Sequence, residues 1–142
     1  IKLRPALADQ GDRLRLLPSW TKGGRAREIP IRTAEQRLVL ADALALAGKG
    51  SLIPPELNYV QQLRRFEHQC AAASIHRVHG HRHEYAQRRY QELNGWASPA
   101  AGGPRSAELT PEQKDLDRDA RLVVSSELGH SRETVTTVYL GR

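Results

Sequence analysis

The apolar residues of this chain change their spacing near Thr33, and this change limits the folds that the chain can adopt. Before Thr33, the stretches IKLRPALA, DRLRLLPSW and GRAREIPI alternate apolar and polar residues, a pattern typical of half-buried strands. Turn-forming residues lie between these stretches at 10–12 and 22–24. We therefore predict a three-stranded antiparallel β-meander over residues 1–32. Its strands should be short or at edges, because each stretch contains a proline, which cannot donate to a ladder.

From Thr33 onward the apolar spacing is helical. Thr33 and Gln36 form a capping box ahead of RLVLADALALAG, and Gly48 is the expected end of this first helix. Thr110 and Gln113 form a second capping box, with proline directly after Thr110 at the first helical position. The remaining pattern predicts helices over residues 54–70, 79–93 and 111–128, and a short last helix that begins after Ser131 and carries Tyr139.

The chain of 142 residues has the length of one domain with a core of its own. Aromatic residues make up only 5% of it, so we expect the core to consist of Leu, Val, Ile and Ala from amphipathic helices. Residues 95–109 are rich in Gly, Pro, Ala and Ser and are expected to form a mobile connection within the domain. The sequence thus predicts an α+β, mainly α, fold with a single domain over 1–142. In it, the β-meander of 1–32 precedes a bundle of about five helices over 33–142.

The charge of the chain favours a polyanionic partner. Lysine and arginine outnumber aspartate and glutamate by 22 to 16, which gives a net charge of +6 and a pI of about 10.0. A polyanion is the partner class that such a charge indicates. The alternative is a basic surface that binds nothing, because net charge concerns association rather than fold.

The single cysteine, Cys70, excludes an internal disulfide and a cysteine-rich zinc site, and it fits a reducing, cytosolic setting. No stretch reaches the ~18 apolar residues of a membrane span, and the first residues contain no apolar signal-peptide segment. We therefore expect a soluble chain.

Four histidines lie within the stretch HRVHGHRH, at positions 76, 79, 81 and 83. His79 and His83 have the spacing that places two imidazoles on one helix face, but no cysteine pair or carboxylate cluster supplies the further ligands of a zinc site. His79 and Arg82 instead share a helix turn, where an imidazole and a guanidinium can bind phosphate oxygens. An exposed, solvated pair is the alternative.

The stretch WTKGGRAREIP places Lys22 at the tip of a predicted hairpin, with Arg25 and Arg27 on the returning strand. A lysine on a Gly-Gly turn can reach a bound polyanion and donate a proton to it. The alternative, for an isolated hairpin, is a lysine that only makes the turn soluble.

Near the end of the chain, LGHSRETVTTVY places His130 directly after Gly129 and Tyr139 nine residues later. Gly129 suits a left-handed helix cap. A tyrosine hydroxyl has a pKa of about 10, so as a nucleophile it needs a neighbouring positive charge or a base. The alternative is a core tyrosine, which is the interpretation that we prefer for the other three tyrosines of the chain.

Taken in order, these motifs resemble the catalytic domain of the tyrosine recombinases, the phage-integrase family. TKGGRAREIPI resembles the family's β-hairpin lysine motif, HGHRH its His-x-x-Arg signature, and LGHSRETVTTVY its Leu-Gly-His segment with the nucleophile nine residues on. The resemblance extends from the hairpin to the last helix. HGHRHEYAQRRYQELNGW is also similar to integrases of mobile integrative elements.

The resemblance implies a role for each matched residue. Tyr139 attacks the scissile DNA phosphate, forms a 3′-phosphotyrosyl link and releases a 5′-hydroxyl. Arg82 stabilises the charge on the non-bridging oxygens, and Lys22 protonates the leaving oxygen. His79 and His130 assist in proton handling and phosphate positioning. The covalent link conserves the energy of the phosphodiester, so no cofactor, ATP or metal is expected.

The resemblance also implies the partners. Double-stranded DNA is bound, with Arg25, Arg27 and Arg89 as the expected contact residues, and the full-length parent forms a tetramer on paired recombination sites. The parent would be a cytoplasmic, nucleoid-associated protein of bacterial or phage origin with no membrane contact.

One part of the family's pattern is missing from the chain. A further catalytic arginine stands in an Arg-x-x-Glu context before the first strand in this family, and Arg4 within IKLRP is a poor substitute. The chain contains no methionine and starts with Ile1. We therefore expect a monomeric C-terminal fragment that binds DNA weakly and does not cleave it alone.

Two other functions compete with recombination. A recombinase-derived module could bind DNA through its basic face without chemistry, and a helical domain could bind zinc. Salt-sensitive DNA binding without a covalent adduct would favour the binding module, and stoichiometric zinc would favour the third hypothesis.

Overall fold

The computed structural model describes residues 2–21, 23–76, 78–130 and 133–142. The fold is mainly helical and contains one small antiparallel sheet. Its backbone contacts divide the chain into two compact units, residues 1–76 (unit 1) and 77–142 (unit 2), and each is described by itself. The single domain expected from the sequence stays a prediction. In the described ranges no helix combines the length and the apolar character that crossing a membrane requires.

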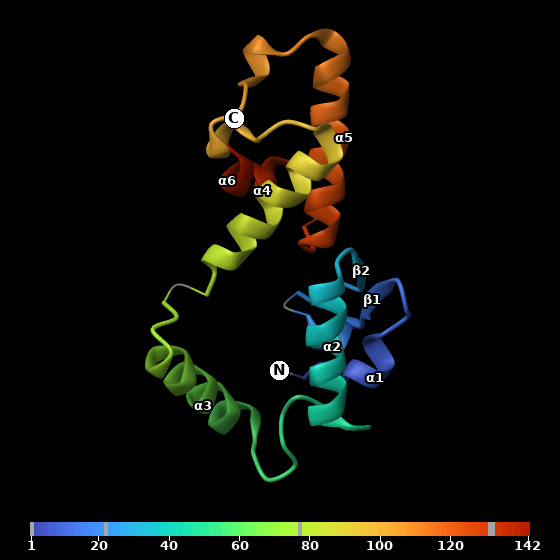
Figure 1. Ribbon diagram of the computed structural model, residues 1–142, viewed down its shortest axis with the longest axis vertical. Helices are drawn as coiled ribbons and strands as arrows, with labels where there is room; N and C mark the ends of the chain where they lie inside the picture. The colour runs from blue at the N-terminus through green and yellow to red at the C-terminus, as the bar shows by residue number, and fades with distance from the viewer. Residues whose placement is uncertain (1, 22, 77, 131–132) are drawn as a thin grey trace. The chain divides into compact units, whose positions relative to one another are not determined.

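Unit 1 consists of a hairpin and helices (Figure 1). The hairpin pairs β1 (Arg13–Leu16) with β2 (Arg27–Pro30), in a register that sets Arg13 opposite Pro30 and Leu16 opposite Arg27. Between the strands lies the short 3-10 helix η1 (Pro18–Trp20), followed by Gly23 and Gly24. Both glycines have positive φ, of 88° and 65°, which a residue with a side chain adopts only at a cost. A hairpin is therefore confirmed, but its strands are shorter than the predicted stretches, because Pro18–Trp20 form η1 where DRLRLLPSW predicted a strand.

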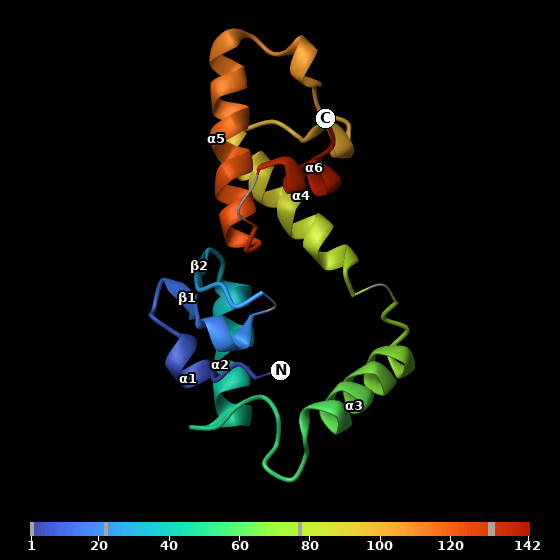
Figure 2. The ribbon, with the colours of Figure 1, turned by 180° about the vertical axis from the view of Figure 1, so that it is seen from behind.

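The predicted three-stranded meander is wrong in its first strand. Residues Pro5–Ala8 form the helical turn α1, and among the described residues only an isolated bridge from Asp9 to Leu14 adds to the pairing of β1 on the side of the predicted first strand. Pro5 occupies the first helical position, where its fixed φ fits and its missing N–H is not needed, and alanine and leucine favour the helix that follows. The alternation in IKLRPALA is too short to outweigh these local preferences. Figure 2 shows α1 beside β1 and α2, which it contacts.

Helix α2 (Ala34–Ala47) has the predicted boundaries, because the Thr33 hydroxyl accepts a hydrogen bond from the Gln36 amide and Gly48 ends the helix. Helix α3 (Tyr59–Ala72) begins later than predicted, since Pro55 lies in a turn. A capping box of Asn58 and Gln61, with bonds of 2.9 and 3.0 Å, sets its actual start. All residues of α3 are described and none of them is buried.

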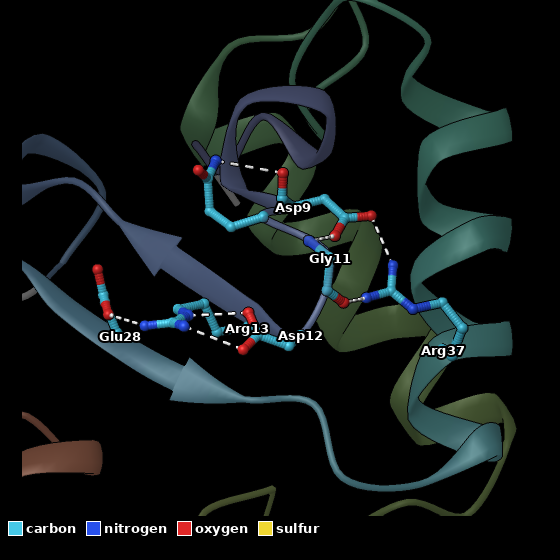
Figure 3. Close-up of polar contacts among 7 residues, drawn as sticks. Asp9, Gly11, Asp12, Arg13, Glu28 and Arg37 are labelled. Carbon is cyan, nitrogen blue, oxygen red and sulfur yellow. Dashed lines mark hydrogen bonds and ion pairs between the residues drawn. The ribbon is translucent and has the colours of Figure 1, made fainter.

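Side chains of α2 and of the turn before β1 share a group of polar contacts (Figure 3). The Asp9 carboxylate accepts hydrogen bonds from Arg37 Nη1 at 2.6 Å and from the Gly11 amide at 2.9 Å. Arg37 also donates to the Gly11 carbonyl. Arg13 donates from β1 to Asp12 at 2.9 Å and to Glu28 on β2 at 3.2 Å. The turn is thus fixed to α2 through Arg37.

Unit 2 is formed by α4 (Gly80–Asn94) and α5 (Pro111–Glu127), with the short α6 (Thr137–Leu140) against α4 (Figures 1 and 2). The 3-10 helix η4 (Glu133–Thr136) precedes α6 and contacts α5. Helix α5 has the predicted capping box and α4 the predicted extent within one residue. The core is made by Ala86, Tyr90, Ala120, Val124, Leu128, Tyr139 and Leu140.

The segment between α4 and α5 is packed in part: residues 96–99, 103, 104 and 109 are buried or half-buried, while 100–102 and 105–108 are exposed. The mobility expected from its composition stays a prediction. It contains the 3-10 helices η2 (Pro99–Ala101) and η3 (Ser106–Glu108). Trp96 packs against the core and Ser98 is fully buried. A Cβ added to Gly103 would lie 1.7 Å from the Ala97 carbonyl oxygen, so the backbone closes tightly there. Ser98 and Gly103 therefore serve close packing in this segment.

The contact between Asp9 and Arg37 generates a pH prediction. The Arg37 hydrogen bond, followed by that of the Gly11 amide, lowers the pKa of the Asp9 carboxyl below its ordinary value. Asp9 therefore stabilises unit 1 above the pKa of the unfolded carboxyl, and this contribution is lost as the pH falls through the lower, folded value. Arg37→Met should raise the pKa of Asp9 toward its ordinary value in a carbon-13 NMR titration. Arg64→Met, on the exposed side of α3, should leave the titration of Asp9 unchanged, and an equal shift in both variants would contradict this account.

Candidate active site

Tyr139 lies on α6 and is only 5% exposed. The neighbouring Leu140 is fully buried in the core, so the short helix is anchored to unit 2 by its apolar side. Gln87 of α4 donates from Nε2 to the Tyr139 carbonyl oxygen at 3.1 Å. The Tyr139 ring therefore has a defined position against α4 rather than that of a free terminal side chain.

The end of α5 places His130 beside Tyr139. The Gly129 amide donates to Ser126 O at 2.9 Å and the His130 amide to Ser125 O at 2.8 Å, which are the two bonds of a Schellman motif. Gly129 has φ of 80°, as predicted for a left-handed cap. The His130 ring stacks on the Tyr139 ring at a centroid distance of 6.0 Å and an interplanar angle of 26°.

The first turn of α4 supplies the other rings of the site. The His79 ring lies 6.1 Å from the Tyr139 ring, and the His83 ring lies 4.7 Å from it in an edge-on arrangement. His79 is the N-cap residue of α4, and His83 follows one turn later. Helical spacing therefore aims both imidazoles at α6.

Arg82 provides the positive charge of the site. Its guanidinium carbon lies 6.0 Å from the centre of the Tyr139 ring. Its Nη2 donates to the Leu128 carbonyl at 2.8 Å and lies 3.5 Å from His130 Nε2. Its Nε is buried and has no hydrogen-bond partner among the described residues. A buried N–H without a partner is costly, so this guanidinium keeps an unused donor beside Tyr139.

The structure thus brings together, within unit 2, four side chains that the sequence singled out: His79, Arg82, His130 and Tyr139. The predicted proton donor Lys22 lies outside the described residues. The other residues of that hairpin belong to unit 1, where Arg25 is exposed and Arg27 is half-buried.

His83 is a residue of the site that the sequence motifs do not single out for phosphate binding. Its spacing from His79 indicates only a possible pair of metal ligands, and the two rings do lie 5.9 Å apart. The four-residue spacing is the sequence signal that could have assigned His83 to the site, because it places His79 and His83 on the same face of α4. Among the described residues there is no cluster of three or more metal-binding side chains.

Arg89, an expected DNA contact, has partners within the molecule. Its guanidinium donates to the Glu127 carboxylate at 3.1 and 3.2 Å, and the side chains are 16% and 8% exposed. Glu127 also accepts a hydrogen bond from the Tyr85 hydroxyl at 2.7 Å. This group ties α4 to the last turn of α5, immediately before Leu128 and its bond to Arg82. Contact of Arg89 with DNA stays a prediction.

Comparison with the models of known protein families, with curated proteins and with solved structures gives no match to this chain. The resemblance to the tyrosine recombinases therefore rests on the sequence motifs, and the geometry of unit 2 has to be judged on its own.

The group around Glu127 generates a stability prediction. Arg89→Met should destabilise unit 2 by about 3 kcal/mol, because it leaves a buried carboxylate without its cation. Urea unfolding followed by circular dichroism measures this loss. The matched control is Arg88→Met, since Arg88 is the exposed neighbour on the same helix. Equal stability of the two variants would show that the Glu127 contact contributes little.

Proposed function

We propose that this chain belongs to the catalytic domain of a tyrosine recombinase, which cleaves and rejoins DNA at specific sites through a 3′-phosphotyrosyl intermediate. The proposal is supported by one observation: the side chains of Arg82, His79 and His130 lie around the ring of Tyr139. The start of α4 supplies His79 and Arg82, the end of α5 supplies His130 and α6 supplies Tyr139, in the order that the motifs of the family have.

The proposed chemistry uses each group at a stated atom. The Tyr139 oxygen attacks phosphorus, the bond from phosphorus to the 5′ oxygen breaks, and a 3′-phosphotyrosyl ester forms. Arg82 donates from its guanidinium to the non-bridging oxygens, where negative charge increases in the transition state. Of the two imidazoles, His79 and His130, one accepts the single tyrosine proton and the other donates a hydrogen bond to the phosphate that Arg82 binds; His130 lies 3.5 Å from Arg82.

The leaving 5′ oxygen needs a proton, and Lys22 is the residue that we assign to this step on its motif alone. Rejoining is the reverse reaction, in which a 5′-hydroxyl attacks the phosphotyrosyl ester. Because the ester conserves the energy of the phosphodiester, the proposed reaction uses no nucleotide cofactor.

The proposed partner is double-stranded DNA, bound with the help of the net charge of +6. Arg25, exposed in the hairpin loop, and Arg27 on β2 are proposed to contact the phosphate backbone together with Lys22. The proposed active assembly is a tetramer on paired sites, working on DNA of the bacterial cytoplasm.

The deciding experiment traps the covalent intermediate. The product of the complete reading frame is incubated with a library of duplexes of random core sequence, each nicked so that a short strand is released after cleavage. We expect adducts that resist denaturation in detergent, and Tyr139→Phe should abolish them because the nucleophilic oxygen is absent. Gel electrophoresis of labelled DNA measures the adduct.

Tyr59→Phe is the matched control, because Tyr59 is 52% exposed on α3 and has no assigned role. It should form adducts at the wild-type rate. Salt-sensitive DNA binding by the wild type without any adduct would contradict catalysis and favour the non-catalytic DNA-binding module. An adduct that persists in Tyr139→Phe would assign the nucleophile to another residue.

A further inference from the structure

The segment that carries Tyr139 is held by side chains of both long helices of unit 2. Gln87 of α4 donates to the Tyr139 carbonyl at 3.1 Å. Arg121 of α5 donates from Nη1 to the Gly141 carbonyl at 2.9 Å. These bonds fix the backbone at the tyrosine itself and two residues after it.

Arg121 is held in place by a buried group of its own. Its Nε donates to both oxygens of the Asp117 carboxylate at 2.9 Å, one turn earlier on α5, and the two side chains are 9% and 13% exposed. Tyr90, which is fully buried, donates its hydroxyl to the same carboxylate. Burial, and then the bond to Asp117, raises the pKa of the Tyr90 hydroxyl, so it stays a neutral donor. One guanidinium therefore serves two fixed partners, which its planar fork allows and a lysine would not.

Gly141 fits this arrangement tightly. Its φ of +77° is unfavourable for a residue with a side chain, and an added Cβ would lie 2.8 Å from the Ala100 amide nitrogen. Helix α6 contacts η2 at this point. The end of α6 is thus enclosed by the backbone of η2 and by Arg121.

Helix α6 has only four residues, and a helix of this length is not stable by itself in water. Its position therefore depends on the contacts that the core and these two side chains make with it. We propose that Arg121 is a positioning residue for Tyr139, which it holds in place through the Gly141 carbonyl, with Asp117 and Tyr90 holding Arg121. The catalytic consequence rests on the proposed recombinase function; the mechanical consequence does not.

The test compares Arg121→Met with Arg118→Met, an exposed arginine of the same helix, in the product of the complete reading frame. The first readout is amide hydrogen exchange of residues 137–142. Loss of a hydrogen bond from a charged donor should speed exchange there by about tenfold or more in Arg121→Met. Exchange in the middle of α4 should change less, and Arg118→Met should behave as the wild type.

The second readout is the rate of covalent adduct formation at saturating DNA, together with the dissociation constant for DNA. A displaced nucleophile should lower this rate by about tenfold or more and leave the dissociation constant unchanged. A residue that only stabilises the fold would leave the rate per folded molecule unchanged.

Arg121→Met also leaves Asp117 buried without its cation, which lowers the overall stability. Gly141→Ala therefore tests the same contact from the other side, because it disturbs the end of α6 and leaves Arg121, Asp117 and Tyr90 intact. It should shift both readouts in the same direction.

The outcomes separate the two proposals. Adducts that form at the wild-type rate in both variants would overturn the positioning role of Arg121, and so would unchanged exchange of residues 137–142. Absence of adducts in the wild type would overturn the proposed recombinase function instead, and the exchange rates would then decide the positioning role alone.

Discussion

The candidate site depends on the contact between α4 and the last turn of α5. Arg82 reaches from α4 to the Leu128 carbonyl at 2.8 Å, and the buried pair of Arg89 and Glu127 joins the same two helices one residue earlier on α5. Without this contact, Arg82 and His130 would have no common position, because 48 residues separate them in the chain. The left-handed turn at Gly129 then sets the direction in which His130 leaves α5.

The site has to hold a costly arrangement of polar groups and also keep these groups in fixed positions. Three imidazoles and a guanidinium surround one tyrosine ring, and the guanidinium keeps a buried Nε without a partner among the described residues. Such a group is costly in the free protein, and an anion bound as the proposed function requires would relieve this cost. The neighbouring core and the bonds to Gln87 and Arg121 supply the rigidity that keeps these groups in place.

The sequence is most informative where a local signal fixes the backbone. The threonines at 33 and 110 predict the starts of α2 and α5, although only Thr110 completes its capping box, because the Gln36 side chain accepts from the Arg32 amide instead of the Thr33 amide. The glycine after Leu128 predicts the turn that presents His130. The predicted first strand and the predicted start of α3 are wrong, since Pro5 and Asn58 carry stronger helix signals than the alternation and the proline pair. Motif order alone selects four residues of the site, and their catalytic roles stay predictions. For His83 the only sequence signal is its four-residue spacing from His79, which indicates a shared helix face but not the contact with Tyr139. The bonds from Arg121 to Gly141 and from Gln87 to Tyr139 could not be predicted, because they span 20 and 52 residues and carry no motif.

The proposed function requires that Tyr139 becomes covalently bound to the 3′-phosphate of a cleaved DNA strand. The most direct measurement is mass spectrometry of the trapped protein after nuclease trimming, combined with enzymatic phosphorylation of the released strand. We expect a nucleotide joined through its 3′-phosphate to the peptide that contains Tyr139, and a free 5′-hydroxyl that a kinase labels directly. A nucleotide attached to another residue, or a released strand that carries a 5′-phosphate, would contradict the proposed role of Tyr139.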